Sequence, residues 1–238
     1  MKSLINAIFI VAGGAGVAAL AGCTAAEVLL PDGFASRADA WDVSGYSPRR
    51  FNQALRFGPY SALQMREGST FSWSIPLHGV ELQRSARPYA FTQAAPGQAP
   101  VEVQCRSVAW NIGRGDDSQR LSFHPGALAG PLMACGLRHG NGFTGALELS
   151  RDGTQLRGRL DGATGGYEVR STHAMAGTSL RSSDPTGFEF RRNGTVLALV
   201  DLLNAGRVHL DRNLAAEERV YLAAAASSIL LLDMEIEG

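Results

Sequence analysis

Gly-Phe-Glu-Phe-Arg-Arg-Asn-Gly-Thr-Val-Leu-Ala-Leu-Val-Asp, residues 187–201, is the stretch that decides the fold. Two runs rich in aromatic and aliphatic residues flank Asn193-Gly194, and these two residue types adopt the positive φ angles of a tight type I′ turn. The stretch therefore predicts an antiparallel hairpin. Asn204-Ala205-Gly206 then predicts a second turn, which leads into a further strand at Arg207-Val208-His209-Leu210.

The same kind of pattern extends toward the N-terminus. Asp152-Gly153 predicts a second hairpin between the strand-like runs 147–151 and 154–157. Further β-rich runs occupy residues 70–75, 89–92, 101–110, 120–123, 132–137, 143–150 and 154–160. Residues 94–100 and 111–118 are rich in turn-forming residues and are expected to form surface loops. The pattern is typical of a mainly β protein.

The end of the chain has a different pattern. Residues 214–236 predict a helix, with Asn213 or Asp211 as its N-cap and two glutamates near the positive end of the helix dipole. Residues 220–232 are apolar on nearly every side. This run spans about 20 Å at 1.5 Å per residue, less than the roughly 30 Å of a bilayer's hydrocarbon core. We therefore expect the helix to be buried within protein.

Together, these patterns predict an antiparallel β-barrel, or a strongly twisted sheet or sandwich, with a buried apolar C-terminal helix. The order of hairpins, followed by residues 187–201 and the apolar helix, resembles the tubby-like fold of the scramblase and LURP-one groups. The resemblance covers residues 57–236 and implies a closed barrel threaded by the helix. It implies no functional residue, and neither a disulfide nor a tether belongs to that family's usual pattern.

The N-terminus carries an export signal. Lys2 supplies a positive charge, and residues 5–20 form a short apolar stretch rich in Ala and Gly. Leu20-Ala21-Gly22-Cys23 resembles the lipobox of bacterial lipoproteins. This resemblance implies cleavage before Cys23, attachment of diacylglycerol to its sulfur, and acylation of its amine, for example with palmitate. Thr24 stands where an aspartate would signal inner-membrane retention, so it favours the outer membrane. The alternative is an ordinary secretory signal peptide followed by a chance cysteine.

These signals divide the chain into three parts. Residues 1–22 are predicted to be a lipoprotein signal peptide, and residues 23–47 a lipidated cysteine followed by a tether and docking residues. Residues 48–238 are predicted to form a single β-rich domain, which begins with a short helix at 47–55 and ends with the helix 214–236. The domain would be anchored to the membrane on the periplasmic side, without a transmembrane helix.

The charge balance argues against a nucleic-acid partner. Lys2 is the only lysine, so the exported chain carries 21 arginines against 22 acidic residues. The arginines are scattered and form no run beyond Arg49-Arg50 and Arg191-Arg192. The expected partners are instead the membrane, through the lipid anchor, and another envelope protein.

Two cysteines remain once Cys23 is lipidated. Cys105 and Cys135 each lie in a strand-like run, in a chain exported to a compartment where disulfides persist. We expect them to form a disulfide. The alternative is a thiol nucleophile or half of a metal site, although the chain has no Cys-x-x-Cys motif.

The sequence contains no recognised catalytic motif. It lacks Gly-x-Ser-x-Gly, His-Glu-x-x-His, a P-loop and a dinucleotide-binding glycine pattern, so we predict no catalytic residue, metal or cofactor. Trp110 and Asp116-Asp117 are weak candidates for ligand binding, against the alternatives of simple packing and a solvated turn. Glu148 and Glu168 would form an acid pair if strands brought them together. His209 is expected on a strand surface.

Three functional hypotheses follow. The first is a non-catalytic envelope lipoprotein that binds another protein, as an accessory or assembly factor, through exposed sheet edges and its tether. The second is a barrel that binds a lipid or another apolar ligand in an internal cavity. The third is an envelope-polymer hydrolase, which requires converging carboxylates or histidines.

Overall fold

The computed structural model describes residues 25–45, 53–77, 80–114, 120–122, 130–140, 142–163 and 165–232. These residues form a 14-stranded sheet and two helices. In chain order, the elements are α1 (Phe34–Arg37), β1 (Ala38–Asp42), β2 (Leu55–Phe57), β3 (Tyr60–Glu67), β4 (Phe71–Leu77), β5 (Val80–Ala94), β6 (Val101–Arg114), β7 (Arg120–Ser122), β8 (Met133–His139), β9 (Thr144–Asp152), β10 (Gln155–Leu160), β11 (Tyr167–Thr172), β12 (Gly187–Arg192), β13 (Thr195–Asp201), β14 (Arg207–Asp211) and α2 (Ala216–Leu230). The predicted mainly β fold with a C-terminal helix is confirmed.

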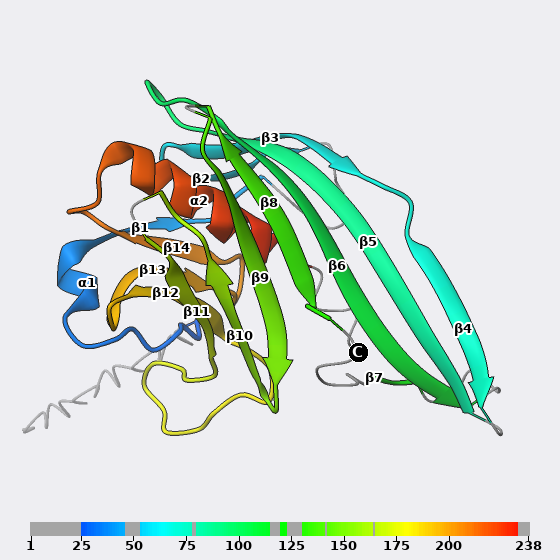
Figure 1. Cartoon of the computed structure of the whole chain (residues 1–238). Helices are drawn as coiled ribbons and strands as arrows, with labels where there is room; N and C mark the ends of the chain where they lie inside the picture. The colour runs from blue at the N-terminus through cyan, green and yellow to red at the C-terminus, as the bar shows by residue number, and fades with distance from the viewer. Residues whose placement is uncertain are drawn as a thin grey trace, which may run out of the picture.

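Twelve of the strands follow one another around a nearly closed antiparallel barrel (Figure 1). Their order is β1-β14-β13-β12-β11-β10-β9-β8-β6-β5-β3-β2. The two ends of this order meet just after β1, where Ser44 and Arg56 of β2 exchange two backbone hydrogen bonds of 2.9 Å. This bridge leaves little exposed sheet edge in the barrel itself.

Helix α2 lies within the curve of the barrel (Figure 1) and packs against strands on several sides of it, including β3, β5, β6, β8, β13 and β14. Every residue from 220 to 229 is buried, as the all-round apolar pattern predicts. Ala223–Ala226 let the strands approach the helix closely. Two hydrogen bonds fix its last turns: the Tyr89 hydroxyl donates to the Ser228 carbonyl at 2.8 Å, and the Ser227 hydroxyl donates to Gln93 Oε1 at 2.7 Å.

Both predicted hairpins are present. Asn193 and Gly194, with φ angles of 51° and 79°, turn β12 into β13, and Gly153, with φ of 63°, lies in the turn between β9 and β10. These left-handed conformations explain why Asn and Gly occupy the turns.

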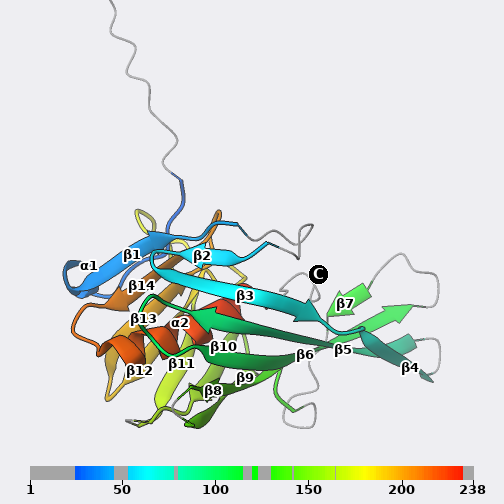
Figure 2. The same cartoon turned by 90° about the horizontal axis from the view of Figure 1, so that it is seen from above.

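Strands β5 and β6 are longer than the barrel requires. Their barrel halves pair with β3 and β8, while their other halves pair with β4 and β7. Figures 1 and 2 show that β4, β7 and these other halves project to one side of the barrel as a four-stranded extension. We call this extension, comprising residues 71–77, 80–86, 108–114 and 120–122, the arm.

The residues before β2 lie closer to the barrel than the sequence suggested. Val28 and Phe34 are buried against Val196 and Leu199, on the face of β13 opposite to α2. Strand β1 pairs along its whole length with β14 and so covers an edge that β14 would otherwise expose. Residues 25–45 therefore belong to the folded part, whereas the sequence predicted a tether and docking residues over 23–47. Most of the predicted helix at 47–55 lies outside the described residues, and Leu55 begins β2.

Candidate functional site

The arm carries an apolar face that has no counterpart in the barrel. Residues directly opposite one another in adjacent strands share one face of a sheet. The arm face, as we call it, comprises two rows across β4, β5 and β6: Phe71, Ala86 and Val108 in one row, and Trp73, Arg84 and Trp110 in the next. Five of these six side chains are apolar, and Arg84 lies between two tryptophans.

The apolar character of β6 changes sides where the strand leaves the barrel. In the barrel half, Val101, Val103 and Cys105 are buried, and the alternate residues Glu102, Gln104 and Arg106 are exposed. Val108 and Trp110 continue the series of the exposed residues, because side chains of a strand alternate between faces. The arm face therefore lies on the side of the sheet away from the barrel core, and α2 does not cover it.

In the second row of the arm face, two tryptophans pack against each other and an arginine lies over one of them. The rings of Trp73 and Trp110 meet edge to face with centroids 5.7 Å apart, and the guanidinium of Arg84 lies 5.7 Å from the centre of the Trp110 ring. Trp110 Nε1 is buried and has no hydrogen-bond partner among the described residues. In the first row, Phe71 is 66% exposed. The other two members of that row, Ala86 and Val108, are buried.

Of the predicted ligand-binding residues, the structure describes only Trp110. It lies in the arm face, where it contacts Trp73 and Arg84. Asp116 and Asp117 lie outside the described residues.

A cavity of about 250 Å³ opens at the end of the barrel where α2 begins. Its lining residues come from several strands and from the first turns of the helix: His139, Phe143, Ala163, Tyr167, Ala215, Glu217, Glu218 and Tyr221. The rings of Phe143 and Tyr221 pack edge to face with centroids 5.7 Å apart.

Side chains in the wall of this cavity form hydrogen bonds with one another and with the backbone. Glu218 accepts hydrogen bonds from the Tyr167 hydroxyl and, at 2.5 Å, from Arg192. The Tyr221 hydroxyl donates to the Asp161 carbonyl at 2.5 Å, and burial raises the pKa of Tyr221, so this phenol stays protonated. Gly145 is required here, because a Cβ atom would lie 2.1 Å from the Tyr221 oxygen. These contacts fix the first turns of α2 to the barrel strands and loops.

The described residues do not form a metal-binding cluster. No group of three or more His, Cys, Asp or Glu side chains among them is arranged to hold a metal ion. Glu148 and Glu168 do not form an acid pair, because both lie opposite Arg159, on the two sides of β10.

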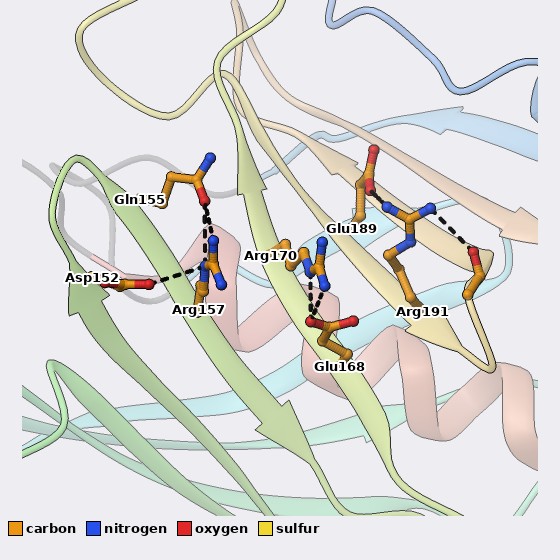
Figure 3. Close-up of polar contacts among 8 residues, drawn as sticks. Asp152, Gln155, Arg157, Glu168, Arg170, Glu189 and Arg191 are labelled. Carbon is orange, nitrogen blue, oxygen red and sulfur yellow. Dashed lines mark hydrogen bonds and ion pairs between the residues drawn. The ribbon is translucent and has the colours of Figure 1, made fainter.

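Charges on the outer face of β10, β11 and β12 are instead compensated in pairs (Figure 3). Arg170 lies 2.5 Å from Glu168, Arg191 lies 3.2 Å from Glu189, and Arg157 lies 3.3 Å from Asp152. Burial raises the pKa of Glu189, against the opposing effect of Arg191 and Arg170. Such neighbouring pairs leave no single-sign patch for an ionic ligand.

His209 is not a surface residue, contrary to the prediction. It is 5% exposed, and its ring centre lies 6.4 Å from that of Phe34, which packs over β14 from α1. Burial and the nearby Arg207 lower its pKa to about 4, so the imidazole is neutral at neutral pH. The prediction was wrong because the alternation of apolar and polar residues along a strand does not show whether another segment covers its outer face.

The predicted disulfide is present. Cys105 of β6 and Cys135 of β8 lie directly opposite each other, with Cα atoms 4.0 Å apart. The bond joins two neighbouring barrel strands close to the point where β6 enters the arm.

Comparisons with known proteins give no identity. No family model matches the chain, and no match was found among curated proteins or solved structures. Neither described helix is long and apolar enough to cross a membrane.

Proposed function

We propose that this protein is a non-catalytic lipoprotein, anchored through Cys23 on the periplasmic side of the outer membrane, which binds another envelope protein through its arm. The anchor rests on the lipobox-like Leu20-Ala21-Gly22-Cys23 and the export signal before it. The role is that of an accessory or assembly factor, in which the barrel acts as a rigid support for the arm.

The observation that carries this proposal is the arm face. The arm face lies outside the barrel core and combines the exposed Phe71 with the half-buried Trp73 and Trp110. Its exposed Phe71 and its Trp73–Trp110 pair are residue types that contribute most to protein interfaces.

The edge of the arm favours a protein over a lipid as the occupant. Among the described residues, β4 pairs with β5 alone, so its other edge presents unpaired backbone groups. Such groups are costly in hydrocarbon, whereas a protein partner hydrogen-bonds them. The two other functional hypotheses have less support, because the buried residues of α2 fill the space that an apolar ligand would need and the sequence holds no recognised catalytic motif.

We also propose a distant relationship to the tubby-like group. The support is architectural: an antiparallel barrel with an apolar C-terminal helix inside it. The relationship assigns no functional residue to this chain.

Site-specific photocrosslinking in the native host tests the binding role. A benzophenone amino acid replaces Phe71 in the full-length protein, and a matched variant carries it at Thr195, which is exposed at the β12–β13 turn, away from the arm. We expect a discrete protein adduct at position 71 that is absent at position 195. No adduct at position 71, or equal adducts at both positions, would overturn the proposal, as would crosslinking to lipid alone.

A further inference from the structure

We infer that the barrel rests directly on the lipid bilayer through a second surface, the anchor face, formed by Leu29, Met175, Leu180 and Leu203. The inference depends on the proposed lipidation of Cys23. It adds that the domain is held against the membrane in one orientation rather than suspended from a flexible tether.

The chain leaves no room for a long tether. The Ala26 carbonyl accepts a hydrogen bond of 2.7 Å from Asn204 Nδ2, and the Glu27 carbonyl accepts one of 2.8 Å from the Ala176 amide. Ala26 is only three residues after Cys23, a span of about 10 Å when fully extended. Acyl chains on Cys23 would therefore keep the surface around Ala26 close to the headgroups.

The surface around this attachment point is apolar. Val28 forms a β-bridge with Met175, the Leu29 amide donates to the Ala174 carbonyl at 3.1 Å, and Ala174 forms a second bridge with Arg181. These contacts place three short segments side by side. Leu29 and Leu180, at 51% and 71% exposed, are two of the few large apolar side chains that the described residues present to solvent.

The turn between β13 and β14 adds to the same surface. Asn204, whose side chain holds Ala26, follows the half-buried Leu203 in this turn. In Figure 2, the blue segment that begins at residue 25 lies on the same side of the barrel as the turns drawn in yellow and orange. The anchor face thus gathers leucines from three parts of the chain.

Two acidic side chains near the anchor face, Glu27 and Asp42, are both paired with Arg207. Glu27 and Arg207 form an ion pair of 2.9 Å, and Arg207 also contacts Asp42 at 2.7 Å. The segment 176–180, Ala-Gly-Thr-Ser-Leu, has no charged side chain. Apolar side chains on such a surface enter the boundary between headgroups and acyl chains, as they do in peripheral membrane proteins.

The arm projects from a different side of the barrel (Figure 2). The bilayer and a protein partner can therefore occupy the anchor face and the arm face at the same time.

Fluorescence quenching tests the orientation. The full-length, acylated protein is placed in nanodiscs of zwitterionic and anionic phospholipid, with bimane attached at Leu180→Cys or, as a matched control, at Ser150→Cys. Ser150 is exposed on β9, which lies on the side of the barrel opposite to residue 25 in Figure 2. Both substitutions are at exposed positions, so neither threatens folding.

We expect lipids that carry a doxyl group just below the headgroup to lower the emission at position 180 by about twofold or more and to leave position 150 unchanged. The mass of the N-terminal peptide and co-purification with nanodiscs are measured separately. Absence of acylation would overturn the proposed anchor itself. Acylated, nanodisc-bound protein whose position 180 is quenched no more than position 150 would overturn the orientation alone, including the case in which another protein covers Leu180.

Discussion

The two halves of β6 carry their large apolar side chains on opposite faces. In the barrel half, Val101, Val103 and Cys105 point toward α2, and the protein supplies its own core. In the arm half, Val108 and Trp110 lie on the other face, where α2 does not reach. Under the proposed function, the barrel half stabilises the fold and the arm half contacts a partner outside the barrel. Substitutions in the two regions should separate stability from binding.

The largest effect is expected inside the barrel. Leu222→Ala should lower the free energy of unfolding by about 2–5 kcal/mol, because Leu222 is fully buried in α2 and its truncation leaves a cavity. Urea denaturation of a chain that begins at residue 25 measures the change. The matched control Leu180→Ala removes the same atoms from an exposed site and should cost less than about 0.5 kcal/mol. Equal losses at the two sites would contradict the central role of α2.

The next effect concerns the disulfide at the base of the arm. Replacing Cys105 and Cys135 together by serine should cost about 3–4 kcal/mol, the value expected for closing a loop of 30 residues in the unfolded chain. Denaturation with and without reductant measures it. The reductant should destabilise the original protein and leave the double variant unchanged, whereas a response of both would mean that the loss has another cause.

A smaller, pH-dependent effect is expected at His209, in the layer that covers the outside of β14. Its pKa is about 4 in the folded protein against 6.5 when unperturbed, so the unfolded state binds the proton more tightly. Above about pH 6.5, His209 does not reduce the free energy of unfolding. As the pH drops toward 4, protonation of the unfolded state lowers this free energy by up to about 3 kcal/mol. Denaturation curves across this range measure it. His209→Gln should flatten this part of the pH profile, and an unchanged profile would assign the acid sensitivity to other groups.

The smallest effect on stability is expected in the arm. Phe71→Ser should change the free energy of unfolding by less than about 0.5 kcal/mol, because Phe71 is largely exposed. With the benzophenone group moved to Arg84, which lies on the same face of the arm, the same substitution should nevertheless weaken the protein adduct. A large loss of stability with the adduct retained would show that Phe71 supports the fold rather than a partner.

Much of the fold was predictable because its signals are local. Asn193-Gly194 and Asp152-Gly153 specify tight turns through backbone sterics, and alternation identified most strands. Strands β1, β2, β3 and β11 were not predicted, although Tyr167-Glu168-Val169-Arg170 in β11 alternates apolar and charged residues. The arm face was not predictable, since its six residues come together only through the register of three strands.

The sequence by itself determined the hairpins, the all-round apolar helix and the pairing of Cys105 with Cys135, and it predicts the lipid anchor at Cys23. These features depend on neighbouring residues, on residue type or on the small number of cysteines. Only the tertiary structure decided that β1 closes the barrel, that His209 is covered by Phe34, and that β5 and β6 extend beyond the barrel with their apolar side reversed. Alternation along a strand shows that its two faces differ, but the face that is buried depends on what the rest of the chain packs against it.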